Sequence, residues 1–117
     1  MNIIVNIILV GLGGAIGSII RFFISSWTAQ KKNPLLGTLF VNVTGSIILA
    51  LIVNAGLREG FSLLLGVGLM GGYTTFSTFN YEVCVLLKKK ALIPAFGYVC
   101  VMYISCIVSV LLVFFFV

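Results

Sequence analysis

The sequence has no histidine and only two acidic residues, Glu59 and Glu82, among its 117 residues. Its three cysteines, Cys84, Cys100 and Cys106, lie inside apolar runs and form no C-x-x-C pair. Transition-metal sites need clusters of such ligands, and covalent catalysis needs a nucleophile beside a base. The sequence offers neither, and we expect that the protein is not an enzyme.

Charge is scarce throughout, because 8% of the residues are charged whereas 62% are apolar. A soluble domain of this size could not bury so much apolar surface, since small domains leave a large share of their surface exposed. Four stretches carry no charge: residues 1–20, 33–57, 60–81 and 91–117. Each is close to or above the ~20 residues that cross the ~30 Å hydrocarbon core as a helix. The composition therefore indicates a membrane protein.

We predict an all-α integral membrane protein with a single domain of four transmembrane helices. The predicted helices cover roughly residues 3–26, 35–56, 61–86 and 92–116. The first apolar run lacks a basic start and further spans follow it, so we expect it to remain in the membrane rather than to be cleaved as a signal.

The basic residues indicate an orientation. The first and third predicted loops carry all the lysines: Lys31, Lys32, Lys88, Lys89 and Lys90. The second loop carries only Arg58, beside Glu59. Short basic loops favour the cytoplasm. We therefore expect a cell-membrane protein with both termini extracellular and the lysine-rich loops cytoplasmic. No extramembrane domain is predicted, so nucleic-acid binding is not expected.

Small and polar residues mark one face of the first two helices. Gly13 and Gly17 stand four apart, a spacing that lets membrane helices approach closely. Thr38, Asn42 and Gly45 form one stripe of the second helix. An asparagine inside a membrane needs a polar partner. Asn42 therefore either holds the bundle through an interhelical hydrogen bond or belongs to a polar wall along an ion path.

The third predicted helix contains GGYTTFSTFNYE at residues 71–82. Gly71 and Gly72 lie near its midpoint, and adjacent glycines weaken a helix. We predict that they break the third helix near mid-membrane; the alternative is that they pack in an unbroken one. A break would direct free carbonyls toward a cation and free N–H groups toward an anion.

The residues after these glycines combine aromatic rings with hydroxyls. Phe76 and Phe79 share one helical face, and Thr75 lies on the same stripe as Phe79. Ser77 and Thr78 lie beside them. Ring edges are weakly positive and hydroxyls donate hydrogen bonds, so this set could solvate a small anion. Several weak contacts suit conduction, because the ion must also leave.

The remaining polar candidates are weaker. Tyr98, Ser105 and Ser109 form a stripe on the fourth helix, where the hydroxyls either line a path or bond back to their own backbone. Glu82 is the only acid inside a predicted span. It either has a function there or pairs with a cation such as Arg21 or a loop lysine.

Three motifs resemble the Fluc (CrcB) family of fluoride channels. The segment GGYTTFSTF resembles the family's GGxTTFSTF signature, and GTLFVNVTGS at residues 37–46 resembles its GTLxVNxxG pattern. The first-helix segment GGAIGSIIRF resembles a glycine-rich stretch that ends in arginine and an aromatic residue. The resemblance covers nearly the whole chain.

The resemblance implies an antiparallel, dual-topology type of dimer with two narrow pores for passive fluoride export. It also implies a central sodium ion, structural and not transported, held by the backbone carbonyls of Gly71 and Thr74. The implied pore residues are Phe76, Phe79, Asn42, Ser77, Thr78 and Thr38, with Arg21 near the aqueous mouth.

The charge bias bears on the dimer. A homodimer of opposed subunits needs little bias, yet here five loop lysines oppose Arg58. We predict an inverted homologous subunit as partner; the alternative is a homodimer that tolerates the bias.

Two alternative functions are also compatible with the sequence. A small-multidrug-resistance-type transporter would need a carboxylate, which the first helix lacks. A non-conducting assembly subunit of a heterodimeric channel is the other.

Overall fold

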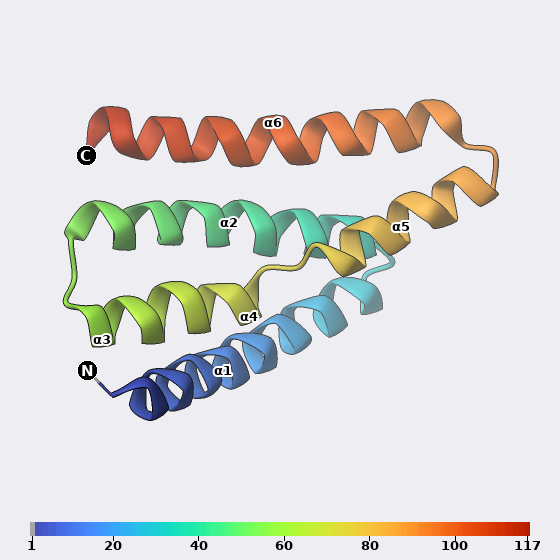
Figure 1. Cartoon of the computed structure of the whole chain (residues 1–117). Coiled ribbons are helices and arrows are strands. Elements are labelled where there is room, and N and C mark those ends of the chain that lie inside the picture. The colour runs from blue at the N-terminus through green and yellow to red at the C-terminus, as the bar shows by residue number, and fades with distance from the viewer. Residues whose placement is uncertain (1) are drawn as a thin grey trace.

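The computed structural model describes residues 2–117, and all regular elements among them are helical (Figure 1). Three helices are long: α1 (Ile3–Gln30), α2 (Pro34–Ala55) and α6 (Leu92–Phe116). Each is long and apolar enough to cross a membrane. Shorter elements connect α2 to α6, namely α3 (Glu59–Phe61), the π-helix η1 (Ser62–Met70), α4 (Gly71–Tyr73) and α5 (Ser77–Lys88). The chain is therefore a multi-pass membrane protein.

Local sequence determines where the long helices begin and end. The Asn2 side chain accepts a hydrogen bond of 2.9 Å from the backbone N–H of Ile4 and caps α1. Pro34 begins α2, where its missing N–H costs nothing, and Gly56 ends it in the left-handed region at φ 62°. Lys32 and Lys90 also have positive φ, in the two tight lysine-rich turns.

These turns give an antiparallel arrangement. Figure 1 shows the start of α1, the end of α6 and the turn between α2 and α3 at one end of the molecule. The two lysine-rich turns lie at the other end. The molecule is 50 Å long, enough for a ~30 Å hydrocarbon core and both interfaces. The expectation that the lysine loops share one end agrees with this topology.

Glycines bring α1 against η1 and α4. A Cβ at Gly13 would overlap the carbonyl oxygen of Leu64, and one at Gly17 would overlap that of Leu69. Both glycines are buried. The prediction that this spacing serves close helix packing is confirmed.

The helical segment that follows α3 is interrupted, but not where the glycines predict. Gly71 and Gly72 both lie inside helix α4, so placing the break at this pair is wrong. Gly72 serves packing, because a Cβ there would overlap the carbonyl of Gly14. The backbone becomes extended at Thr74, with ψ 160°, and helix resumes at Ser77.

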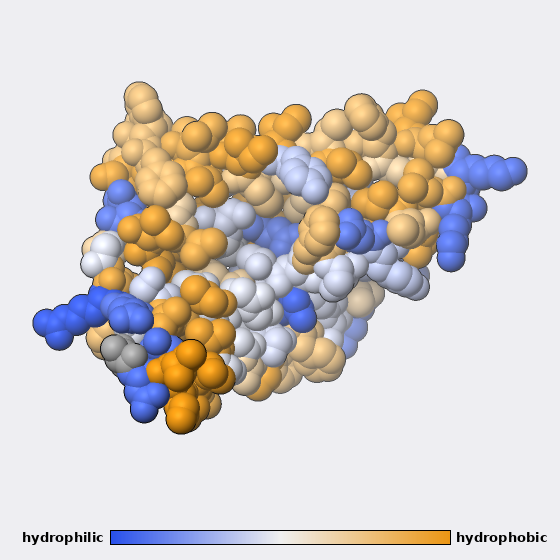
Figure 2. Space-filling view, viewed as in Figure 1, coloured by the Kyte–Doolittle hydropathy of each residue, from blue (hydrophilic) through white to orange (hydrophobic). Residues whose placement is uncertain are grey.

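Most large apolar side chains are exposed, and the buried cluster is small, with Val41, Met70 and Tyr73 at its centre. Figure 2 shows hydrophobic residues over α6 and over much of this face. Paler and hydrophilic residues gather in the middle of the face, between α2 and the interrupted segment. Besides the hydrophilic residues at the two ends of the molecule, a polar region therefore lies at the interruption.

Candidate ion site at the helix interruption

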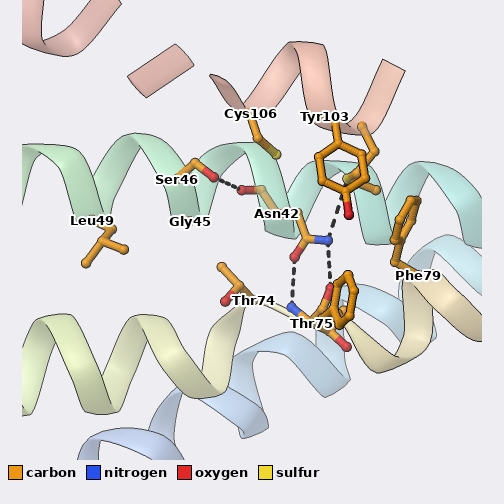
Figure 3. Close-up of a pocket in the computed structure, with 11 residues that line it drawn as sticks. Asn42, Gly45, Ser46, Leu49, Thr74, Thr75, Phe79, Tyr103 and Cys106 are labelled. Atoms are coloured by element: carbon orange, nitrogen blue, oxygen red, sulfur yellow. Dashed lines mark hydrogen bonds between the residues drawn. The ribbon is translucent and has the colours of Figure 1, made fainter. Parts of the chain in front are cut away.

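Asn42 holds the interrupted backbone through both halves of its side-chain amide. Its Nδ2 donates to the carbonyl oxygen of Thr75 at 2.8 Å, and its Oδ1 accepts from the Thr75 N–H at 2.8 Å (Figure 3). Thr75 is buried, with 7% of its surface exposed. Buried backbone groups need hydrogen-bond partners, and here a side chain from α2 replaces the partners that a helix would supply.

The first consequence concerns the carbonyls before the interruption. In a continuous helix the Thr75 N–H would bond to the carbonyl of Gly71, but here it bonds to Asn42. The Gly71 carbonyl is thus released from that bond. The neighbouring Thr74 carbonyl accepts a hydrogen bond of 3.0 Å from Nη1 of Arg21. Arg21 therefore reaches the interruption itself, at the negative end of α4, rather than only an aqueous mouth.

The second consequence concerns the start of α5. The Thr75 hydroxyl oxygen accepts a hydrogen bond of 3.2 Å from the N–H of Thr78. It caps one of the free N–H groups that begin this helix. The side chains of Ser77 and Thr78, both predicted to contact an anion, are exposed. The positive end of α5 and two exposed hydroxyl-bearing residues thus follow the interruption directly.

We call the two hydrogen bonds between Asn42 and Thr75 the clasp. A cavity of about 300 Å³ lies against it. Its lining comprises Asn42, Gly45, Ser46, Leu49, Thr74, Thr75, Phe76, Phe79, Met102, Tyr103 and Cys106 (Figure 3). Three residues predicted from two motifs, Asn42 from one and Phe76 and Phe79 from the other, therefore meet at one cavity. Thr38, Ser77, Thr78 and Arg21 are not part of its wall.

The two phenylalanines have different environments. Phe79 is 3% exposed, whereas Phe76 is 65% exposed. Their ring centroids lie 6.4 Å apart with tilted planes. The Phe79 ring also packs against Tyr98 at 5.2 Å and against Tyr103, edge to face, at 6.0 Å. The Phe79 ring is therefore packed inside the chain, while the Phe76 ring lies at its surface.

The residues of the predicted stripe on α6 have different contacts. The Tyr98 hydroxyl donates to Oε1 of Glu82 at 2.9 Å, so the partner of Glu82 is a tyrosine rather than a cation. The Ser109 hydroxyl bonds back to the carbonyl of Ser105 at 2.6 Å. Ser105 itself lines a different groove. Thr38 is buried, and its hydroxyl bonds back to the Pro34 carbonyl at 3.4 Å.

The sequence reasoning overlooked part of the cavity wall. Met102 and Cys106 follow Tyr98 at four and eight positions, so helical spacing alone could have found them. Both side chains are apolar, however, and so give no polar signal on that stripe. Tyr103 lies off that stripe, and no spacing would have indicated its contact with Phe79. The hydrogen bond of 2.8 Å between the hydroxyls of Thr44 and Tyr73 has no such indication either.

Comparison with known proteins gives one consistent result. The family model described as CrcB-like protein, Camphor Resistance (CrcB), matches residues 8–114. A protein of Anaeromyxobacter sp. (strain K) named fluoride-specific ion channel FluC is 40% identical over 111 residues, covering 89% of this chain and 88% of that protein.

Relatives from two other bacteria agree. One of Bacillus cereus, named fluoride-specific ion channel FluC 2, is 39% identical over 86% of each chain. One of Listeria monocytogenes, named fluoride-specific ion channel FluC 1, is 39% identical over 93% of this chain and 94% of its own. The similarity therefore spans nearly the whole chain, including the cavity and its clasp.

Proposed function

Because the chain belongs to the CrcB family, we propose that it is a subunit of a fluoride-selective channel that lets fluoride leave the cell passively. The observation that carries the proposal is the meeting of Asn42, Phe76 and Phe79 at one cavity beside an interrupted helix. The names of the relatives supply the identity of the ion.

The chemistry of the cavity suits a small anion. Transfer of a bare ion from water to a medium of low dielectric costs tens of kcal/mol, so its lost water must be replaced by donors. The start of α5 supplies free N–H groups, and the positive edges of the Phe76 and Phe79 rings supply weaker attraction. The Nδ2 of Asn42 donates its second hydrogen to the sulfur of Met102 at 3.6 Å, a weak acceptor that an anion would replace.

The phenylalanines suggest that the path is shared between subunits. Phe76 is exposed next to a cavity that its own subunit leaves open. In an antiparallel dimer, the exposed ring of one subunit would reach the cavity of the other. We propose that η1, α4 and α5 together form the third membrane crossing, with both termini outside the cell.

A structural sodium ion fits part of this arrangement. Unwound carbonyls and helix C-terminal ends are the usual sodium ligands in broken membrane helices. The Gly71 carbonyl, released by the clasp, would be one ligand. The Thr74 carbonyl already accepts from Arg21 but has a second lone pair. Such a cation would hold two subunits together and favour an anion nearby.

The charge bias suggests the partner. The lysine-rich turns lie at one end of the subunit and Arg58 at the other, so one orientation is strongly favoured. An opposed neighbour is then most readily an inverted, separately encoded homologue. The alternative is a homodimer that tolerates the bias.

The deciding experiment is fluoride efflux from liposomes that contain this chain, alone and with a candidate inverted homologue, with chloride as the control ion. Efflux of fluoride but not chloride supports the proposal, and dependence on the second chain identifies a heterodimer. If correctly inserted protein passes no fluoride in either preparation, the channel proposal fails and a non-conducting assembly role replaces it. Resistance to cationic drugs, if the chain conferred it, would indicate a transporter instead.

A further inference from the structure

A second and larger groove lies away from the cavity at the interruption. It has a volume of about 720 Å³ and runs between the last turns of α1 and the first half of α2, with Ser105 of α6 at its edge. It shares no lining residue with the first cavity. Residues such as Leu36, Leu39 and Phe40 make most of its wall apolar.

One end of this groove is cationic. Nζ of Lys31 lies 4.2 Å from the centroid of the Trp27 ring, and both residues line the groove with Asn33. Trp27 is 58% exposed. A lysine and a tryptophan together at a helix end are typical of the membrane interface, where the ring sits at headgroup level. Lys32 follows directly in the same turn.

Within the described chain no acid faces this cation. Neither Glu59 nor Glu82 lines the groove. Glu82 accepts from Tyr98, and Glu59 accepts from the Asn6 side chain at 3.4 Å. Both carboxylates thus have a hydrogen-bond partner within the chain, away from Lys31. The complementary occupant must itself carry a negative group and a hydrocarbon part.

We propose that this groove is a binding site for an anionic phospholipid, with the headgroup at Lys31 and Lys32 and an acyl chain along Leu36, Leu39 and Phe40. Anionic headgroups are attracted by basic residues at the cytoplasmic surface, and basic pockets between membrane helices bind them selectively. Hydrocarbon chains gain from contact with the apolar wall. The proposal does not depend on which ion the protein conducts.

The protein offers a direct probe, because Trp27 is its only tryptophan. We would reconstitute the full chain in two bilayers of equal charge, each a mixture of phosphatidylglycerol and phosphatidylcholine. Only the phosphatidylglycerol chains are brominated in the first bilayer, and only the phosphatidylcholine chains in the second. Bromine quenches tryptophan fluorescence on contact, so the ratio of the two quenching levels reports which lipid occupies the groove.

The anionic lipid is expected to be preferred by about fivefold or more over the zwitterionic one. The double variant Lys31→Gln, Lys32→Gln should bring the ratio close to one. The matched control, Lys88→Gln, Lys89→Gln, Lys90→Gln, removes charge from the other turn at the same end and should keep the preference.

Three results would overturn the proposal. Equal quenching by both lipids would mean that Trp27 contacts only ordinary boundary lipid. Absence of quenching by either would mean that protein covers the groove. An equal loss of preference in the control variant would mean that general membrane charge, rather than this site, attracts the lipid.

Discussion

Asn42 and Thr75 exchange two hydrogen bonds of 2.8 Å, one in each direction, across the gap between α2 and the interrupted segment. The side-chain amide pairs with the N–H and the carbonyl of Thr75, as the backbone of a neighbouring strand would in a β-sheet. The backbone carbonyl of Asn42 also accepts a hydrogen bond of 2.7 Å from the Ser46 hydroxyl, one turn further along α2. Of the two alternatives raised by the sequence, the hydrogen bond that holds the bundle is observed. The polar wall of an ion path stays a prediction.

Replacement of this amide should cost stability as well as conduction. Asn42→Ala leaves a buried N–H and a buried carbonyl of Thr75 without partners, at about 1–3 kcal/mol each. We expect a clearly lower midpoint of thermal unfolding in detergent, measured by circular dichroism, together with loss of fluoride efflux. Asn54→Ala, at an exposed position of the same helix, is the control. Lost efflux with unchanged unfolding would mean that Asn42 contacts only the ion.

Alanine variants of the two phenylalanines should differ in stability although both lose function. Phe79 is buried against two tyrosines, so Phe79→Ala should destabilise the subunit by about 3–5 kcal/mol. Phe76 is largely exposed, so Phe76→Ala should change the subunit's stability by less than about 0.5 kcal/mol. We expect both variants to lose fluoride efflux. Efflux that survives in Phe76→Ala would remove this ring from the proposed path.

The glycine face of α1 predicts a steric effect with a matched control. Gly17→Ala would place a methyl group on the Leu69 carbonyl, whereas a Cβ at Gly11 meets nothing within 4 Å. Gly17→Ala should therefore destabilise the protein by about 1–3 kcal/mol, because the backbone of α1 must move away. Gly11→Ala on the same helix has room for its methyl group and should leave the unfolding midpoint unchanged or slightly raised, since alanine favours a helix over glycine. Similar midpoints for the two variants would contradict the close packing.

The helical class and part of the cavity wall could be predicted from the sequence, because both depend on local pattern. Uncharged runs mark long helices, and Asn42 and Phe79 lie in short, specific motifs. Reasoning from the sequence misplaced the interruption because a glycine pair signifies either flexibility or close packing, and only the neighbouring helix decides which. Gly72 faces Gly14, so it packs. The actual opening at Thr74 is fixed by Asn42, a partner 33 residues away from Thr75.

The same limit applies to charged partners. Nothing in the spacing of the sequence places Arg21 at the Thr74 carbonyl, since the two are 53 residues apart. The motif suggested only a basic residue near the mouth of a pore. For Glu82 the sequence allows either a cationic partner or a functional role. Its contact with Tyr98 depends on how α5 and α6 cross, which the sequence does not show.

The contact of Arg21 with Thr74 predicts a sodium effect. If a sodium ion uses the same carbonyl, the guanidinium repels it by at least about 1 kcal/mol, a factor of about five in affinity. Arg21→Gln keeps a donor but removes the charge, and should lower the sodium concentration needed for half-maximal thermal stabilisation by about fivefold. An exposed arginine at the other end, changed in Arg58→Gln, should leave this concentration unchanged. An unchanged or higher requirement in Arg21→Gln would place sodium away from Thr74.

The lysine-rich turns predict how the chain enters the membrane. Lys31, Lys32, Lys88, Lys89 and Lys90 gather at one end of the subunit. Positive residues in short loops stay in the cytoplasm, so the chain expressed alone should insert with both termini outside. A C-terminal alkaline phosphatase fusion should be active and a C-terminal green fluorescent protein fusion dark. With all five lysines changed to glutamine, both reporters should give signal, because the remaining Arg58 and Arg21 favour no single orientation. Strong signal from both reporters in the unmodified chain would show that it inserts in two orientations, and the inverted neighbour could then be a second copy of itself.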